Sequence, residues 1–335
     1  MDPISQGVVG ASFSQSTAKQ KVDIKMATVL GFLSGMAPDL DILIRSAQDP
    51  LLGLEYHRQF THSLAFIPIG GLLCALIAKI FIKNKLSFLQ VYIFCTVGWA
   101  THGLLDACTT YGTLLFWPFS YQRVAWNNVS IIDPLFTLPL LILMVMTLIK
   151  KKKQYAQWAC AYIIVYLGFG LLQAQRARYF LQSKIADRQH HAEKIMVSPS
   201  FANLLLWRTV YEYEGYYYVD AVRVGVTQQI FQGDKIKKFE KYQDLPWLVK
   251  GSTQDRDIER FRWFTNDYLS WSDKNPYTIQ DVRYAMSPRA TQSLWGLELS
   301  PNAQDKHALF ERVSRDSSKD REEFWEMLFY KATNQ

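Results

Sequence analysis

Histidines and aspartates occur in three short motifs within the apolar first half of this chain. The motifs are Pro38-Asp39-Leu40-Asp41, His57-Arg58-Gln59-Phe60-Thr61-His62-Ser63 and His102-Gly103-Leu104-Leu105-Asp106. Ionisable groups are costly inside or beside a bilayer, so their presence in apolar segments indicates a function. Imidazole and carboxylate together are the ligand types that bind a divalent cation such as zinc or manganese. The sequence therefore predicts a membrane-bound metal site.

The spacing within these motifs limits which side chains can act together. His57 and His62 are five residues apart, about 140° out of register on an α-helix, so at least one of them must lie on a loop or a bent turn. His102 and Asp106 are four residues apart and share a helix face, so both can ligate one ion. Alternatively, Asp106 does not bind the ion but orients the His102 ring through a hydrogen bond. We expect His57, His62, His102 and Asp106 to hold the metal; taken singly, each is also consistent with a structural role at the membrane edge.

Asp39, Asp41 and Arg58 are the candidate catalytic residues. One aspartate would supply a metal carboxylate, and the other would act as a base on water whose pKa a bound divalent ion lowers towards neutrality. Arg58 would pair with the oxygens of an anionic substrate such as a phosphoester. Structural alternatives stay open. Pro38 ends a helix and the aspartates follow in the turn, while Arg58 equally suits an anchor at lipid headgroups.

Long apolar segments surround these motifs. Segments of about twenty mostly apolar residues, enough to cross a hydrocarbon core of about 30 Å, occupy residues 64–82, 86–105, 131–149 and 155–174. A weaker candidate spans residues 24–44. Residues 4–16 are rich in small side chains and too short for a full span, so we expect a re-entrant or tilted helix that protein covers.

Positive charge orients the spans. Lys83 and Lys85 follow the first strong span and the lysines at 150–153 follow the third, and such basic turns face the cytoplasm. Asp106 then lies on the outer side, as does Asp133, which precedes Pro134 and is expected to cap a helix. At a rise of about 1.5 Å per residue, the segments carrying His62 and His102 reach the same outer edge of the hydrocarbon layer. The motifs are therefore expected to share one site.

Beyond about residue 175 the chain is polar and rich in Tyr, Trp and Arg. Residues 204–224 have strand character, and Gly215 supplies a hairpin turn. Residues 305–329 are expected to form a closing amphipathic helix, with Leu309, Phe310, Val313, Phe324 and Leu328 on its apolar side. We predict a mainly α fold: a polytopic transmembrane helical domain (residues 1–175) followed by a soluble α+β domain (residues 176–335) on the periplasmic side.

The charge pattern argues against a nucleic-acid partner. The formal net charge of +7 comes partly from lysines that flank apolar segments rather than from a basic soluble face. The four cysteines lie in or beside apolar segments without CxxC spacing, so we expect them to pack among helices. The first twenty residues lack the basic region and compact apolar core of a cleavable signal peptide, so internal spans would direct export.

Four motifs, taken in chain order, resemble those of a known family: Met1-Asp2-Pro3-Ile4-Ser5-Gln6-Gly7, Gly35-Met36-Ala37-Pro38-Asp39-Leu40-Asp41, His57-Arg58-x-x-Thr61-His62-Ser63 and His102-x-x-x-Asp106. This is the LexA-regulated, membrane-bound family of predicted metal-dependent hydrolases (YdjM-like). The resemblance covers roughly residues 1–150 and implies a multi-pass protein of the bacterial inner membrane. It also implies a metal centre at His57, His62, His102 and Asp106, assisted by Asp39 and Asp41. Gln6 stands where many family members carry a histidine, and an amide is a poorer zinc ligand.

Two classes of function stay open. As an enzyme, the protein would use a divalent metal, zinc first and manganese second, to direct water at an ester, with a phosphoester of a lipid or envelope molecule as the leading candidate. As a non-catalytic envelope protein, it would carry a structural metal or a hydrogen-bonded cluster and an outer domain that binds a partner. An open coordination position distinguishes a catalytic from a structural ion. A transporter or channel is disfavoured because the charged residues gather at one face.

Overall fold

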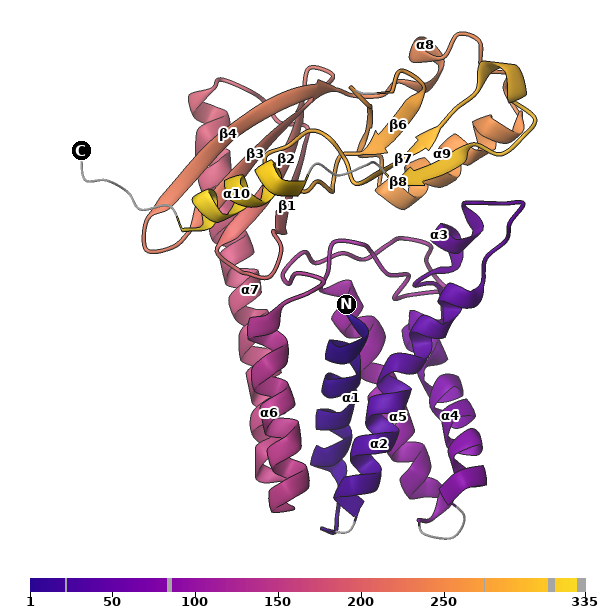
Figure 1. The fold of residues 1–335 in the computed structure, drawn as a ribbon, viewed down its shortest axis with the longest axis vertical. Helices are drawn as coiled ribbons and strands as arrows, with labels where there is room; N and C mark the ends of the chain where they lie inside the picture. The colour runs from indigo at the N-terminus through magenta and orange to yellow at the C-terminus, as the bar shows by residue number, and fades with distance from the viewer. Residues whose placement is uncertain (22, 83–85, 274, 313–316, 330–335) are drawn as a thin grey trace. The chain divides into compact units, whose positions relative to one another are not determined.

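The computed structural model describes residues 1–21, 23–82, 86–273, 275–312 and 317–329 (Figure 1). Lys83, Lys85 and Val313, on which the sequence interpretation partly relied, lie outside these residues. The chain divides into two compact units. The first comprises Met1–Ile44, Tyr56–Leu172 and Phe201–Asn203, and the second comprises Arg45–Glu55, Gln173–Ser200 and Leu204–Gln335.

The first unit is helical, as its apolar segments predict. Its helices are α1 (Pro3–Thr17), α2 (Asp23–Met36), α4 (Ile67–Ile82), α5 (Phe88–Ala107), α6 (Pro134–Lys150) and the first half of α7 (Gln154–Asp187), with the 3-10 turns η1 (Ala37–Leu43), η2 (Phe60–His62) and η3 (Leu64–Phe66). Within the described chain, four segments are long and apolar enough to cross a membrane: Asp23–Leu43, Leu64–Ile82, Phe88–Ala107 and Gln154–Asp187. α6 is a shorter apolar helix of 17 residues.

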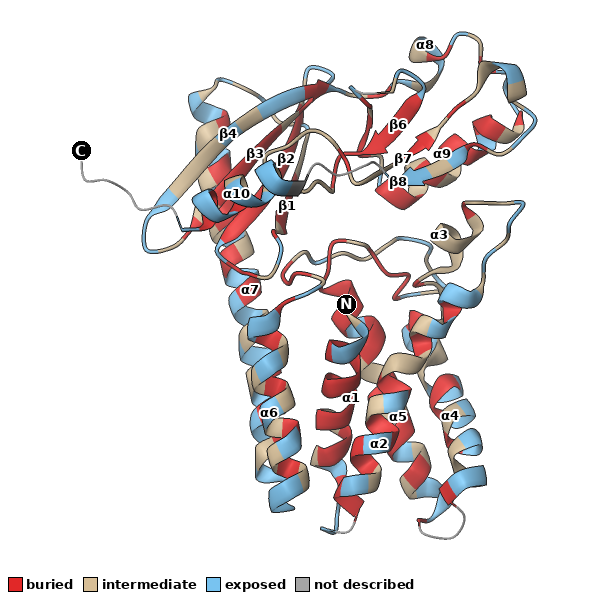
Figure 2. Ribbon diagram, viewed as in Figure 1, coloured by how far each residue is buried: buried red, intermediate tan, exposed pale blue. Residues whose placement is uncertain are grey.

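Much of α4 and α6 is exposed, as the pale blue stretches of their ribbons in Figure 2 show, and many of the exposed residues are apolar. Exposed residues on α4 include Ile69, Leu72, Leu73, Leu76, Ile77, Ile80 and Phe81, and those on α6 include Leu135, Leu138, Ile142, Val145 and Ile149. Lipid tails are as apolar as these side chains, whereas a soluble monomer rarely exposes so continuous an apolar surface. The first unit is therefore built to face lipid.

α1 is buried along most of its length and packs against α2, α5 and α6 (Figure 2). Its contact with α2 depends on glycine, because a Cβ at Gly10 would lie 2.4 Å from the carbonyl oxygen of Gly31 and a Cβ at Gly31 would lie 2.5 Å from that of Gly10. Small residues allow two helix backbones to approach this closely. The segment at residues 4–16 is thus a helix covered by protein.

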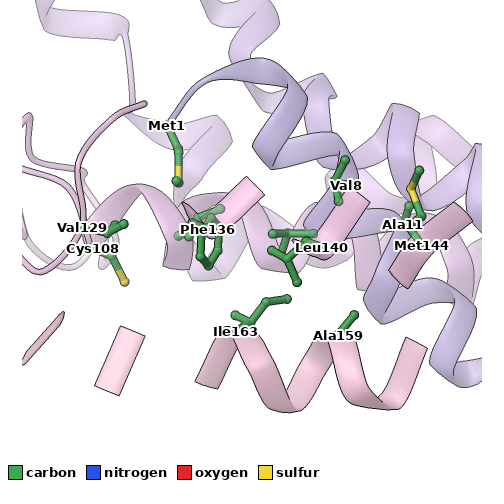
Figure 3. Close-up of a cluster of buried hydrophobic side chains, with 12 residues drawn as sticks. Met1, Val8, Ala11, Cys108, Val129, Phe136, Leu140, Met144, Ala159 and Ile163 are labelled. Atoms are coloured by element: carbon green, nitrogen blue, oxygen red, sulfur yellow. The ribbon is translucent and has the colours of Figure 1, made fainter. Parts of the chain in front are cut away.

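One apolar cluster joins α1 to α6 and α7 (Figure 3). Val8 of α1, Phe136 and Leu140 of α6, and Ile163 of α7 are among its buried members. Asp133 begins α6 as an N-cap, because its carboxylate accepts hydrogen bonds from the backbone N–H groups of the second and third helical residues, at 3.1 and 3.3 Å. The capping role expected of Asp133 is confirmed.

α7 continues beyond the predicted end of the last span at residue 174. Its 34 residues extend about 51 Å at 1.5 Å per residue, which is longer than a hydrocarbon core. From Gln173 onward the helix belongs to the second unit. There Gln173 Nε2 donates to the carbonyls of Leu204 and Val224 at 3.0 and 2.9 Å, and Arg188 donates to Asp220 at 2.6 Å. These polar contacts hold the far half of α7 against a sheet.

The second unit is rich in sheet. Its described residues form two four-stranded antiparallel sheets, one of β1 (Lys194–Pro199), β2 (Leu206–Tyr213), β3 (Tyr216–Val224) and β4 (Gln228–Lys237), the other of β5 (Leu269–Trp271), β6 (Thr278–Asp281), β7 (Trp295–Glu298) and β8 (Leu309–Arg312). Its shorter helical elements are α3 (Leu52–Tyr56), α8 (Lys241–Asp244), α9 (Thr253–Thr265), η4 (Pro301–Ala303) and α10 (Ser317–Leu328). Gly215 makes the β2–β3 turn with φ +73°, as expected. The predicted fold class, membrane helices followed by a soluble α+β region, is confirmed.

The expected closing helix at residues 305–329 is wrong in its first half. Leu309 and Phe310 belong to β8, where they pair with Glu298 and Leu297 of β7. The helix α10 begins only at Ser317, and Phe324 and Leu328 are buried on it. Pairing with a neighbouring strand satisfies the backbone of residues 309–312, and this non-local contact is invisible to helical periodicity.

Two arginines tie distant parts of the second unit together. Arg208 on β2 is buried and donates to three backbone carbonyls within residues 282–290. Arg260 on α9 makes two hydrogen bonds to each of the carboxylates of Asp49 and Glu55. Burial acts to raise the pKa of Asp49, but the hydrogen bonds from Arg260 and from a backbone N–H outweigh it, so this pKa is lowered.

Candidate metal centre

The candidate site lies at one end of the first unit, where α2 and α5 end and α4 begins. Asp39 and Asp41 are in η1, which directly follows α2. His57 is in a turn, and His62 closes η2 before α4. His102 and Asp106 occupy the last turns of α5. The helix ends thus bring together motifs that are far apart in the sequence.

Four ligand atoms gather around one point. Nε2 of His62 and Nε2 of His102 are 2.9 Å apart. Oδ1 of Asp39 lies 3.4 and 3.3 Å from these two nitrogens, and Oδ2 of Asp106 lies 3.2 and 3.6 Å from them. A tetrahedral ion with bonds of about 2.0–2.1 Å separates its ligand atoms by about 3.3 Å. These five distances therefore fit one divalent ion.

Hydrogen bonds behind the imidazoles fix which nitrogen faces this point. Nδ1 of His102 lies 2.6 Å from the carbonyl oxygen of Gly35, which only accepts, so Nδ1 carries the proton. Nδ1 of His62 lies 2.9 Å from the hydroxyl oxygen of Thr61, which donates its own proton to Asp41 and can therefore accept one from Nδ1, and 3.2 Å from Oδ2 of Asp41. Both rings then direct the lone pair of Nε2 towards the centre, the arrangement found behind metal-binding histidines. Two such lone pairs repel unless a cation, either a shared proton or a metal ion, lies between them.

Asp106 is held from several sides. Gln6 Nε2 donates to its Oδ1 at 2.8 Å, the α-ammonium group of Met1 pairs with the same oxygen, and Arg58 Nε lies 3.0 Å from Oδ2. Within the described residues, Oδ2 is buried and accepts no hydrogen bond of good geometry. A buried carboxylate oxygen in this state, facing two imidazole nitrogens, is suited to ligate a cation.

Asp41 organises the His57–His62 segment. Its Oδ1 lies 2.8 Å from His57 Nδ1, and its Oδ2 accepts hydrogen bonds from the Arg58 backbone N–H at 2.9 Å and from the Thr61 hydroxyl at 3.0 Å. Arg58 has φ +64°, a region that residues other than glycine rarely occupy. The hydrogen bond to Asp41 holds this conformation, so Asp41 sets the direction of both histidines of the motif.

The Arg58 guanidinium is directed at Asp106 and Thr109 rather than at solvent. Its side chain is 6% exposed, and Nη1 donates to the Thr109 hydroxyl at 2.8 Å. The guanidinium carbon lies 4.7 Å from the centre of the Tyr111 ring, and that of Arg123 lies 5.3 Å from the same ring. The sequence did not indicate that Arg123 and Tyr111 belong to the site, because they lie in the loop after α5, outside any motif or helical repeat.

The structure groups the candidate residues into two overlapping sets. Asp39, His62, His102 and Asp106 form the first set, and Asp39, Asp41 and His57 form the second, with the ligand atoms of each set within 4.8 Å of one another. His57 therefore lies outside the tetrahedral set, and Asp39 lies inside both. The sequence could not indicate Gly35 as a site residue, because Gly35 acts through its backbone carbonyl, a group that every residue type has.

Comparison with known proteins concerns mainly the helical half. A family model described as "YdjM inner membrane protein" matches residues 1–177, which include every residue of both sets. The chain is also similar to inner membrane protein YbcI of Escherichia coli (strain K12), with 35% identity over 105 residues. That match covers 30% of this chain and 60% of the relative. No solved structure matches the chain.

Proposed function

Because this chain belongs to the YdjM inner membrane protein family, we propose that its helical unit is a membrane-bound hydrolase that depends on a divalent metal ion. The observation that carries the proposal is the tetrahedral arrangement of ligand atoms from Asp39, His62, His102 and Asp106. An ion held there supplies Lewis-acid activation of water for attack on an ester.

The residues around the ion have separate tasks under this proposal. His62, His102 and Asp106, whose side chains are fully buried, hold the ion, while Asp39 is 25% exposed and marks the side from which water and substrate enter. Asp41 orients His62, and Arg58 offsets the charge of Asp106. In the reaction the water oxygen bonds to the phosphorus or acyl carbon as the ester bond breaks, and the leaving oxygen takes one proton of the water.

An anionic ester in or on the lipid bilayer is the proposed substrate, with a phosphoester of a lipid or envelope molecule as the leading candidate. The positive charge of a second guanidinium supports this choice. Arg123 lies over the same Tyr111 ring as Arg58 and donates to the carbonyls of Gly112 and His57 at 2.8 and 3.4 Å. The lysine run between α6 and α7 supports a topology in which the site and the C-terminal region face the periplasm.

A non-catalytic envelope protein is the second candidate function. The burial of three of the four ligands favours it, because structural zinc sites are closed by four protein ligands. The polar cluster would then fix the ends of α2 and α5, and the second unit would bind a partner.

Measuring the metal content of the purified protein tests whether the site binds a metal ion, which both proposals require. Elemental mass spectrometry of detergent-purified protein is expected to find zinc or manganese in wild type and to find the buried ion lost in His62→Ala and His102→Ala. Purified wild type loaded with either metal should then hydrolyse phosphoester or phospholipid substrates. Absence of metal after reconstitution would refute both metal-based proposals, whereas bound metal without hydrolysis of any ester would leave the structural ion.

A further inference from the structure

A second group of ligands adjoins the tetrahedral set. Asp39, Asp41 and His57 each offer one atom within 4.8 Å of the others. His57 Nδ1 and Asp41 Oδ1 are 2.8 Å apart. Asp39 belongs to both groups, and its Oδ1 already faces the nitrogens of His62 and His102. A carboxylate has two oxygens with lone pairs, so one aspartate can serve two ions at once.

The two groups differ in their access to solvent. In the first set only Asp39 is partly exposed, whereas in the second both Asp39 (25%) and His57 (22%) are partly exposed. The first set offers four protein ligands and the second offers three. Catalytic ions keep a coordination position for water, and structural ions are closed. The second set therefore has the coordination number and the access that chemistry on a substrate requires.

The charge of a centre with two ions suits an anionic substrate. The carboxylates of Asp39, Asp41 and Asp106 meet at this end of the unit, where Arg58 pairs with Asp106. The α-ammonium group of Met1 also pairs with Asp106, so three carboxylates face two cations and the net charge of the centre is −1. One divalent ion makes this charge positive and a second makes it more so, which suits an ester that is itself an anion.

We propose that the centre binds two divalent ions bridged by Asp39, a buried one held by His62, His102 and Asp106 and a solvent-facing one held by Asp41 and His57. The solvent-facing ion binds the anionic group of the substrate, and the buried ion fixes the bridge. Paired ions in hydrolytic sites lie about 3.5–4 Å apart and clamp the attacking and leaving oxygens. The inference rests on the proposed metal centre and adds a second ion to it.

The test is the metal content of full-length protein in detergent after loading with Mn²⁺ alone. Wild type is compared with His57→Ala, which alters a partly exposed ligand, and with His191→Ala, an exposed histidine of the second unit that serves as the matched control. We expect about two equivalents in wild type and the control, and about one in His57→Ala. The electron paramagnetic resonance spectrum of wild type should show an exchange-coupled Mn²⁺ pair, and that of His57→Ala an isolated ion.

The outcomes separate this inference from the proposed function. One equivalent in both wild type and His57→Ala would overturn the second ion and leave the four-ligand centre standing. Two equivalents and a coupled signal in His57→Ala would overturn the role of His57 and with it the second set. Absence of metal in wild type would overturn both proposals together.

Discussion

Gly103→Ala should separate His62 from His102 without touching a ligand atom. Gly103 follows His102 on α5 and faces the backbone of His62. A Cβ at this position would lie 2.0 Å from the carbonyl oxygen of His62, whereas ordinary contact begins at 3.4 Å. The new Cβ and the His62 carbonyl oxygen must therefore move apart by about 1.4 Å. Because α5 packs against α1, α2 and α4, and His62 ends a three-residue turn, the turn should yield rather than the helix.

The expected effect is large because a metal site tolerates little displacement. Ligand distances vary by about 0.2 Å in genuine sites, so a shift of His62 by about 1.4 Å removes it from the ion. Loss of a hydrogen-bond partner behind a ligand already costs about 10- to 100-fold in metal affinity. We therefore expect Gly103→Ala to weaken metal binding by at least about 100-fold, with an overpacking cost of about 1–3 kcal/mol in stability.

The assay is chelator competition for Zn²⁺ or Mn²⁺ on protein purified in detergent. Gly168→Ala is the matched control, because Gly168 is also in a membrane helix and a Cβ there meets no atom within 4 Å. Both variants make the same change in helix propensity. If Gly103→Ala bound the metal as tightly as Gly168→Ala, the placement of His62 against α5, and the metal centre built on it, would be refuted.

Three further predictions concern stability. Gly10→Ala should push α1 from Gly31 of α2 and destabilise the helical unit by about 1–3 kcal/mol, measured by thermal unfolding in detergent; an unchanged midpoint would contradict the close helix contact. Arg208→Met should lower the free energy of unfolding by about 3 kcal/mol, because three buried carbonyls lose their donor. Denaturant unfolding followed by tryptophan fluorescence measures this change, and a loss well below about 1 kcal/mol would contradict the role of Arg208. Arg260→Gln should cost about 1 kcal/mol at pH 7. Since Arg260 lowers the pKa of Asp49, this stabilisation is present above the ordinary Asp pKa of about 3.9 and is lost as pH falls through the lowered value; a gap to wild type that stays constant down to pH 2 would exclude this pair as its source.

Local sequence patterns predicted the structure correctly wherever it depends on a single segment of the chain. Apolar length predicted the spans at α4, α5 and α7, because a helix that faces lipid needs about twenty apolar residues whatever its neighbours are. Asp133 before Pro134 predicted an N-cap, and Gly215 predicted a hairpin turn. Each of these depends on a backbone conformation within a few residues.

Local sequence patterns failed to predict the structure where hydrogen bonds to a distant segment determine it. Residues 309–312 have the periodicity of a helix but pair with β7. α7 runs beyond residue 174, where Arg178 donates to the carbonyl of Ile195 at 3.3 Å and Arg188 donates to Asp220 at 2.6 Å. In both cases the deciding hydrogen bonds come from elements far away in the sequence.

The sequence by itself determined which side chains are candidates to bind a divalent ion, because its His and Asp motifs lie within apolar segments. It also predicted that these side chains reach one level of the bilayer. Only the tertiary structure decided which atoms meet: Asp39 joins His62 and His102 at 3.3–3.4 Å, His57 turns to Asp41, and Arg58 turns to Asp106. The physical reason is that ligand geometry is set to tenths of an ångström by side-chain direction and by backbone groups such as the Gly35 carbonyl, and motif spacing specifies neither.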